Sequence, residues 1–346
     1  DLTNLSLIFE YRSDKLLGKI NGRDHIANKN YSYTYDYDNT TKLPKSLKEV
    51  TPTANFEKRL TYDGLNRVKT EKYINNHTLS TTNSTVHVEN VYDNAGILTE
   101  VKDKTTNASL WEVTEENAKG QAKNINFGNG ITNARTYDSY GFLTSIRDTK
   151  AGVNALKMDY VFDAERSILT SRKNYAFGNW EETFTHDHQD RLTNITGDVS
   201  HEQVYDNKGR IDFNSNLGAY NYNSNKIYQL EKIELNAAGD THFNNHASQQ
   251  ISYNAFKKPV SIHQENKGRI DFEYGPLQNR TNAYYGGEQT NKNARQFHKQ
   301  YSSITPVEIV HDKTEGSVKI ITYVGGDGYT APIAHIKKVG GSTPTN

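Results

Sequence analysis

The chain has 346 residues, with 41 Lys and Arg against 41 Asp and Glu, and it contains no cysteine. The balanced charge removes the electrostatic argument for a nucleic-acid partner, and the absence of cysteine excludes disulfides, zinc–thiolate sites and cysteine nucleophiles. Apolar residues make up only 34%, against about 45–50% in an average globular chain, so a large conventional core is not expected. No apolar run approaches the roughly 20 residues that cross a bilayer, so we expect no membrane insertion.

A polar composition of this kind also raises the possibility of disorder. The chain carries 23 Tyr and 12 Phe, whereas disordered segments are poor in aromatic residues. A single-layer sheet with both faces partly solvated needs few aliphatic residues and many amphipathic rings. The composition therefore favours an ordered, strand-rich chain.

The chain opens on Asp1-Leu2-Thr3-Asn4 without an initiator Met, and we interpret it as a fragment of a longer protein. Strands are expected near Ser6–Tyr11 and Tyr31–Tyr37. In the second of these, tyrosines at every other position lie on one face of the strand. They form either a strip that stacks on sugars or an aromatic ladder packed between strands, and the ladder is the favoured interpretation.

A longer phrase begins at Tyr137 and runs to Asp148: an aromatic residue, an Asp, two variable residues, a Gly and a short apolar strand. Asp138 can bond to a backbone N–H two residues on and open a turn, and Gly141 can adopt positive φ. Residues 142–146 have the β-branched and aromatic content of a strand. The phrase predicts strand, turn, strand.

The phrase recurs along the chain, which a marginally stable hairpin requires. The good copies begin at Tyr62-Asp63, Tyr92-Asp93 (with Gly96), Tyr137-Asp138 (with Gly141) and Tyr205-Asp206 (with Gly209), and the weaker ones at Phe162, His186, Tyr222 and Tyr253. The spacing varies from 17 residues (Tyr205 to Tyr222) to 45 (Tyr92 to Tyr137). Rungs of a strict solenoid need a near-constant length, so a sheet with strands of variable length fits better.

This phrase, Tyr-Asp-x-x-Gly-Arg-Leu in its ideal form, resembles the YD repeat of the Rhs family over roughly Tyr11 to Ile336. Residues 299–336, with Tyr323-Val324-Gly325-Gly326-Asp327-Gly328-Tyr329, also look like the late core strands of bacterial Rhs proteins. The resemblance implies a long sheet that coils into a hollow shell around a polypeptide, as in Rhs toxins, toxin-complex C components and teneurins. It also implies a secreted or cell-surface location, and a polypeptide cargo or the rest of the parent shell as partner, with secretion machinery as a further one.

Many Rhs shells end in a self-cleaving region with an Asp-Pro motif, and this sequence has no Asp-Pro dipeptide. We therefore expect a chain with no catalytic, cofactor-binding or metal-binding residue. The repeat residues Tyr62, Asp63, Tyr92, Asp93, Gly96, Tyr137, Asp138, Gly141, Tyr205, Asp206 and Gly209 are expected to serve turn architecture alone.

Counting from the aromatic residue of each turn as zero, an apolar residue recurs at offset six (Val68, Leu98, Leu143) and often at offset nine (Val101, Ile146). An odd difference of three places these side chains on opposite faces of a regular strand. Either the sheet is buried on both faces or a bulge lies between the two positions. The sequence leaves both open.

Three other clusters invite a chemical interpretation. His186-Asp187-His188 resembles a metal cluster but coincides with a repeat turn, and no third ligand is evident. His242 and His246 are four apart, in an Asn-rich segment expected to be a loop. Gly325-Gly326-Asp327-Gly328 lacks the Lys and helix of a phosphate loop and is expected to be a hairpin turn.

Together these observations predict an all-β protein, with one curled, mostly antiparallel sheet over residues 1–339 and a flexible tail over 340–346. The expected function is a non-catalytic scaffold that encloses, carries or displays a polypeptide. The alternative is a glycan-binding module using exposed rings such as Trp111, Trp180 and the Tyr31–Tyr37 strip; ring exposure separates the two.

Overall fold

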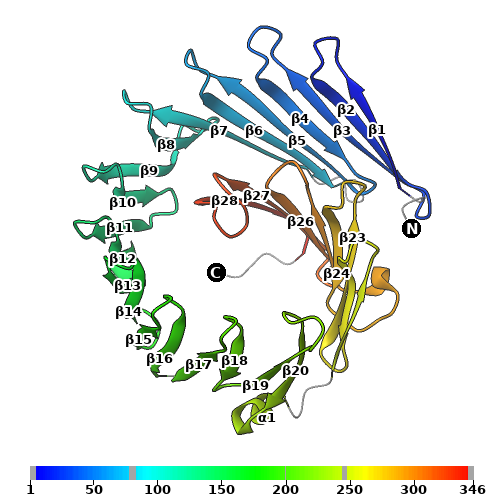
Figure 1. Ribbon diagram of the computed structural model, residues 1–346. Helices are drawn as coiled ribbons and strands as arrows, with labels where there is room; N and C mark the ends of the chain where they lie inside the picture. The colour runs from blue at the N-terminus through cyan, green and yellow to red at the C-terminus, as the bar shows by residue number, and fades with distance from the viewer. Residues whose placement is uncertain (1–4, 78–82, 199, 244–247, 342–346) are drawn as a thin grey trace. The chain divides into compact units, whose positions relative to one another are not determined.

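A computed structural model describes residues 5–77, 83–198, 200–243 and 248–341, and their regular secondary structure is almost entirely β-strand (Figure 1). Within them, helix is confined to α1 (Ala237–Phe243) and a 3-10 turn, η2 (Lys292–Ala294). Strands β1 to β20 form a 20-stranded sheet and β21 to β28 an eight-stranded sheet. Consecutive strands pair antiparallel wherever a register is defined, as in β5 with β6 and β26 with β27, so the predicted all-β, antiparallel class is confirmed.

The strands of the 20-stranded sheet are β1 (Leu5–Tyr11), β2 (Leu17–Asp24), β3 (Lys29–Tyr37), β4 (Pro44–Val50), β5 (Ala54–Tyr62), β6 (Val68–His77), β7 (Asn83–Tyr92), β8 (Leu98–Asp103), β9 (Ser109–Glu116), β10 (Ala122–Phe127), β11 (Thr132–Tyr137), β12 (Leu143–Lys150), β13 (Val153–Asp163), β14 (Ile168–Asn174), β15 (Glu181–His186), β16 (Leu192–Gly197), β17 (His201–Tyr205), β18 (Ile211–Asn214), β19 (Gly218–Tyr222) and β20 (Leu230–Leu235). Those of the eight-stranded sheet are β21 (Gln249–Tyr253), β22 (Pro259–Gln264), β23 (Gly268–Tyr274), β24 (Arg280–Tyr285), β25 (Phe297–Tyr301), β26 (Val307–Asp312), β27 (Ser317–Val324) and β28 (Ile333–Val339).

The chain divides into two compact units. Unit 1 comprises residues 1–111 and 247–346, and unit 2 comprises residues 112–246. The two units differ in how they bury apolar surface. The predicted tail is described only at Gly340 and Gly341; residues 342–346 lie outside the described part.

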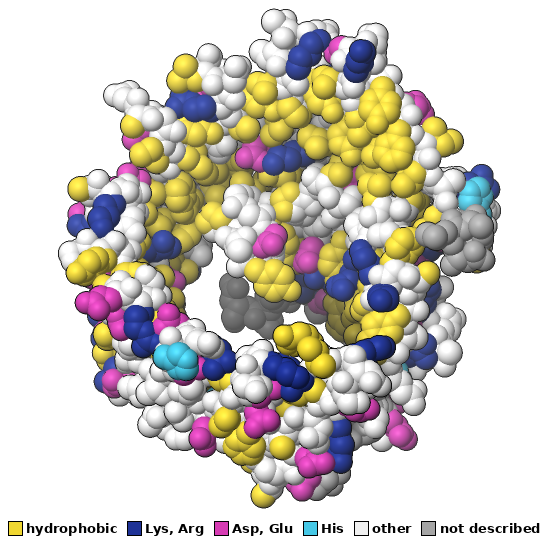
Figure 2. Space-filling model, in the orientation of Figure 1, with side chains coloured by type: hydrophobic (Ala, Val, Ile, Leu, Met, Phe, Trp, Pro, Cys, Tyr) yellow, Lys and Arg dark blue, Asp and Glu magenta, His cyan; other side chains and the backbone are white. Residues whose placement is uncertain are grey.

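Unit 1 has two layers, because strands β5 to β8 pack against β26 and β27 of the second sheet. The buried apolar side chains of this core are Ala54, Phe56, Tyr73, Val86, Val88 and Val101 from the first layer and Val307, Ile309, Val318, Ile320 and Val324 from the second. On β6 the buried positions alternate at Tyr73, Asn75 and His77, which is the period of a strand with one covered face. Figure 2 shows hydrophobic side chains gathered over β1 to β8 of this unit.

Unit 2 is a single layer. Among its described residues Ile125 is the one buried apolar side chain, and the strand positions are otherwise mostly half-buried or exposed. Both faces of its hairpins are therefore partly solvated, as the low apolar content suggested. Its stability depends on strand pairing and on contacts between neighbouring hairpins, because there is no second layer to cover a core.

Helix α1 corrects one expectation, since the segment containing His242 was expected to be a loop. Asn236 caps the helix: its side-chain Oδ1 accepts a hydrogen bond from Gly239 N at 2.9 Å, and its carbonyl accepts one from Asp240 N at 2.8 Å. His246, its proposed partner, lies outside the described residues. No helix among the described residues is long and apolar enough to cross a membrane.

Candidate functional site

The predicted site residues lie at the hairpin turns, and these turns are the candidate functional site. Tyr62, Tyr92, Tyr137 and Tyr205 end β5, β7, β11 and β17, and the residue at offset six begins the next strand in each case. Each turn therefore has the strand–turn–strand arrangement expected for the phrase.

The repeat Asp organises the turn with both of its oxygens. Asp206 Oδ1 accepts hydrogen bonds from the backbone N–H groups of Lys208 (2.8 Å) and Arg210 (3.0 Å), and its Oδ2 accepts one from Arg210 Nε at 2.7 Å. Asp63 makes the same set with Leu65 and Arg67. Although burial works against ionisation, the hydrogen bonds from Arg210 hold the pKa of Asp206 below its usual value.

Offset four carries positive φ in every one of these turns. Gly96, Gly141 and Gly209 have φ of 88°, 103° and 79°. Asn66 takes this place in the Tyr62 turn with φ of 63°, so Gly64 is not the counterpart of the other glycines. The backbone bond from Gly209 N to the carbonyl of Asp206 at 3.0 Å closes a tight turn that ends in this left-handed residue.

Where offset five carries an Arg, as at Arg67, Arg191 and Arg210, that side chain connects its turn to the next one along the chain. Its guanidinium lies over the Tyr ring of the following repeat, at 4.4 Å for Arg67 on Tyr92, 4.4 Å for Arg191 on Tyr205 and 4.2 Å for Arg210 on Tyr222. The same Arg pairs with its own Asp, at 2.7 Å for Arg67 Nε and Asp63 Oδ2. We call this Asp, Arg and following Tyr the Asp–Arg–Tyr bridge.

The Tyr hydroxyl makes a second connection to the preceding repeat. It donates a hydrogen bond to the carbonyl oxygen at offset six of that repeat, from Tyr92 to Val68 (2.8 Å), from Tyr205 to Leu192 (3.0 Å) and from Tyr222 to Ile211 (2.8 Å). Sequence reasoning missed this contact, although the preference for Tyr over Phe and the Arg at offset five were available signals. The repeat Tyr is thus an inter-repeat residue as well as a turn residue.

A bulge resolves the spacing of the apolar offsets. Tyr92 pairs with Leu98 whereas Val91 pairs with Glu100, so one extra residue lies in β8 between these partners. The extra residue makes the interval between offsets six and nine effectively even, and Leu98 and Val101 contact the same core. The same register shift precedes the aromatic residue at Tyr62, Tyr137 and Tyr205.

Further copies of the turn escaped the sequence search. Backbone bonds close the same kind of turn after Tyr11, Glu116 and Tyr274, and a turn one residue longer follows Tyr37. These copies lack the Asp or the Gly that marks the phrase: Lys15 and Gln278 supply the positive φ, at 67° and 60°. The repeat is therefore more regular in space than in sequence.

Of the tyrosines of β3, Tyr31 and Tyr33 are buried and Tyr35 and Tyr37 are half-buried. Tyr31 and Tyr33 are 3% and 0% exposed and form a core cluster with Ile20, against which Tyr35 and Ile304 pack. Trp111 packs against the main core, and Trp180 lies under the guanidinium of Arg172 at 5.2 Å. The strip is a packed ladder, not an open groove for a sugar.

The other candidate clusters have structural roles. His186 occupies the aromatic position of its repeat and pairs with Leu192, while Asp187 bonds to Arg191, which lowers the pKa of Asp187 to about 2. Residues 325–332 connect β27 to β28, and Asp327 Oδ1 accepts bonds from Tyr329 N and Thr330 N. The predicted hairpin turn at Gly325–Gly328 is confirmed.

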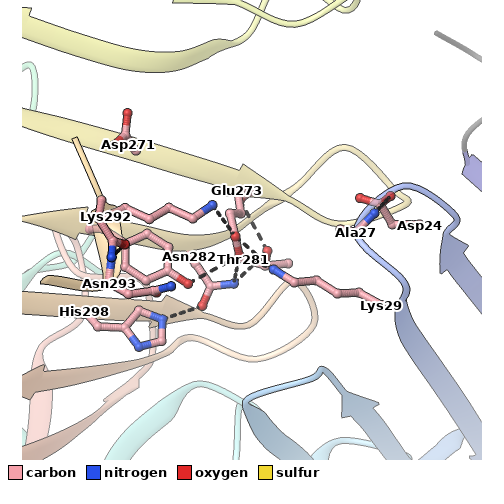
Figure 3. Close-up of polar contacts among 12 residues, drawn as sticks. Asp24, Ala27, Lys29, Asp271, Glu273, Thr281, Asn282, Lys292, Asn293 and His298 are labelled. Carbon is pink, nitrogen blue, oxygen red and sulfur yellow. Dashed lines mark hydrogen bonds and ion pairs between the residues drawn. The ribbon is translucent and has the colours of Figure 1, made fainter.

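A polar cluster, which the sequence did not reveal, ties β3 to the second sheet in unit 1. Glu273 on β23 accepts bonds from Lys29 Nζ (2.8 Å), Lys292 Nζ (2.6 Å) and Asn282 Nδ2 (2.9 Å) (Figure 3). Burial alone would raise the pKa of Glu273, but the two lysines outweigh it and lower the pKa. The Glu273 carboxylate thus bonds to one lysine of β3 and one of η2, and the cluster is a structural tie.

A fully buried carboxylate, that of Glu49, has no cationic partner among its hydrogen bonds. Glu49 on β4 is 0% exposed and accepts bonds from Ser302 Oγ (2.8 Å), Ser303 N (2.8 Å) and Ser303 Oγ (2.9 Å). Burial raises the pKa of Glu49 despite these bonds. It too joins the first sheet to the second.

In sequence comparisons, no family profile and no curated protein matches the chain. Solved structures do match its fold. A crystal structure of TcdB2-TccC3-TEV aligns over 98% of this chain and 22% of its own, with 11% identity and a TM-score of 0.51. The Photorhabdus luminescens Tc holotoxin pore with the mutation TccC3-D651A aligns over 92% of this chain and 21% of its own, with 12% identity and a TM-score of 0.50. The chain thus shares a fold with part of Tc toxin chains and spans about a fifth of their length.

Proposed function

We propose that the chain is a non-catalytic scaffold segment of a bacterial Rhs/YD-repeat protein that encloses, carries or displays a toxin or another polypeptide. The observation that carries the proposal is the Asp–Arg–Tyr bridge. In this bridge, the residues that define the repeat make contacts between successive hairpins, as Asp206, Arg210 and Tyr222 do. The shared fold with Tc toxin chains supports the same role.

The repeat residues are unsuited to catalysis, because catalytic groups are unique and finely positioned, whereas these recur with replacements along the chain. Both oxygens of Asp206 are already engaged within its own turn. The proposal therefore assigns no catalytic, cofactor-binding or metal-binding residue. Its partners are a polypeptide cargo or further repeats of the parent chain, in a secreted or cell-surface protein, with secretion machinery as a third partner.

Protease protection tests this role. The parent protein is expressed with its full coding sequence and digested under native conditions, and the polypeptide encoded next to the repeats is followed by mass spectrometry. We expect that polypeptide to resist digestion until the repeats unfold, while the same polypeptide produced alone is degraded. Equal digestion rates in the two samples would refute enclosure. A parent gene with no further repeats would also count against it.

Glycan binding receives no support from the Tyr31–Tyr37 strip, because Tyr31 and Tyr33 are buried. A glycan array on the purified chain separates the alternatives: the scaffold proposal expects no binding above background. Specific binding abolished by substitutions at exposed rings would favour the alternative.

A further inference from the structure

Three histidines from the two layers of unit 1 meet at their interface. His77 ends β6 of the first sheet, and His298 and His311 lie on β25 and β26 of the second. His77 and His298 are 1% and 4% exposed. None belongs to a repeat turn, and the scaffold role proposed above assigns them no function.

Their geometry places the rings in one contiguous group. His298 and His311 are directly opposite each other in the register of β25 and β26. The ring of His77 meets that of His311 edge to face, with centroids 5.8 Å apart and an interplanar angle of 70°. His298 also stacks on Tyr284 at 4.5 Å, and its Nε2 lies 2.8 Å from Asn282 Oδ1 (Figure 3).

The charged groups that face the histidines are poorly placed to balance a new positive charge. Lys313 opposes protonation of both His298 and His311. Glu273 favours protonation of His298, but it already bonds to two lysines. Asp312 favours protonation of His311, but it already accepts bonds from Gln296, Thr314 and Glu315. A proton on any of the three rings would also disfavour protonation of the other two.

Burial lowers the pKa of His77 and of His298 to about 4, and it lowers that of His311 as well. A group whose pKa is depressed by folding contributes stability above its unfolded value of about 6.5 and loses it as the pH falls toward the folded value. The histidines therefore favour the closed interface at neutral pH and oppose it in acid.

We propose that His77, His298 and His311 form an acid-sensitive joint between the two sheets of unit 1, which opens when the rings become protonated. The alternative interpretation of such a cluster is a metal site. However, no group of three or more His, Cys, Asp or Glu side chains among the described residues has the geometry to hold a metal ion. The joint responds to protonation of the three rings, and protonation loosens β6 locally from β25 and β26.

The test combines two measurements on the whole chain. Histidine side-chain NMR between pH 8 and pH 4 reports the protonation of each ring. Hydrogen exchange with mass spectrometry, corrected for the intrinsic rate at each pH, reports the opening of β6, β25 and β26. For each fully shifted histidine, the ratio of open to closed interface should rise roughly 100-fold between pH 7 and pH 4.

The triple variant His77→Gln, His298→Gln and His311→Gln should lose most of this pH dependence, and His188→Gln, at an exposed position, should retain it. If the triple variant does not fold, the NMR titration of the unmodified chain still decides. Ordinary pKa values for His77 and His298 in the folded chain would overturn the proposal. So would loss of protection that begins in unit 2 and leaves β6, β25 and β26 protected.

Discussion

The guanidinium of Arg191 lies 4.4 Å from the centre of the Tyr205 ring, which belongs to the next repeat. Arg191 is held from the other side by Asp187, and Tyr205 returns a hydrogen bond to the carbonyl of Leu192. The Arg at offset five of this repeat therefore belongs to its own turn and also fixes the position of the following hairpin. In unit 2, where there is no second layer, such contacts carry much of the lateral cohesion.

Removing one hydroxyl tests that cohesion. Tyr205→Phe keeps the ring beneath Arg191 but removes the bond donated to Leu192 and the bond accepted from Gln203 Nε2, so the free energy of unfolding should fall by about 1 kcal/mol. Urea denaturation followed by circular dichroism measures it. Tyr140→Phe, at a side chain that is 72% exposed, is the matched control and should leave stability unchanged. Equal effects of the two substitutions would show that the inter-repeat bond contributes nothing.

The left-handed position at offset four tests the turn itself. Gly209→Val should destabilise the fold by about 1–3 kcal/mol, because Gly209 has φ of 79° and a β-branched residue is strained there. Gly209→Asn should cost less, since Asn66 already occupies this place with φ of 63°. Gly64→Ala is the control, because a Cβ at Gly64 meets no atom within 4 Å. A Gly64 variant as unstable as the Gly209→Val variant would contradict this assignment.

The repeat Asp should act through hydrogen-bond acceptance more than through charge. Asp206→Ala should lower the melting temperature, because three hydrogen bonds to its carboxylate are lost. Asp206→Asn should lower it less, since Asn254 accepts the corresponding backbone bonds in its own turn. Differential scanning calorimetry measures the melting temperatures of both variants, and the protease-protection assay described above is run on the same variants. Loss of protection at an unchanged melting temperature would show that the turn has a role beyond architecture.

Glu273 tests the polar tie between the sheets of unit 1. Glu273→Gln leaves Lys29 and Lys292 without their carboxylate, and we expect a loss of about 1–3 kcal/mol, discounted for the partial exposure of both lysines. The pKa of Glu273 is lowered by folding, so the difference should shrink as the pH falls below about 4.5. Glu234→Gln, in an ion pair exposed by 60% or more on both sides, should have no measurable effect. A pH-independent loss would rule out an electrostatic origin.

Glu49 should show the opposite sign. Its pKa is raised by burial, so the stability it contributes is complete below its ordinary value of 4.5 and is lost as the pH rises through the folded value. Glu49→Gln should flatten this decline, because the amide remains neutral at every pH. Urea denaturation from pH 4.5 to pH 8 measures the slope. If the variant keeps the slope of the unmodified chain, a group other than Glu49 causes the decline in stability.

Local chemistry explains what the sequence could predict. The turn at Tyr205-Asp206 and Gly209 is built from bonds within five residues, so the phrase carries enough information to identify it. The strands could be predicted from the alternation of residues and the aromatic content of segments such as β3. Turns such as the one after Tyr274 escaped notice because Gln278 adopts positive φ without a glycine.

Longer-range features could not be read from the spacing. The contact of Arg191 with Tyr205 depends on the bulge that sets the register of each hairpin, and the irregular intervals hide it. The meeting of His77 with His311 requires the second sheet to pack on the first, and nothing near either histidine in the chain indicates its partner. For the same reason the ties through Glu49 and Glu273 were unforeseen.

The Asp–Arg–Tyr bridge uses only the residues around a turn, and it places no condition on how far the strands extend from it. Strand β13 has 11 residues and β18 has four, yet each runs to or from a turn of this repeat. Coding segments that begin and end at turns could therefore be duplicated or exchanged by recombination without disturbing the junction with their neighbours. The length of individual hairpins can then change during evolution while the contacts between neighbouring hairpins stay the same.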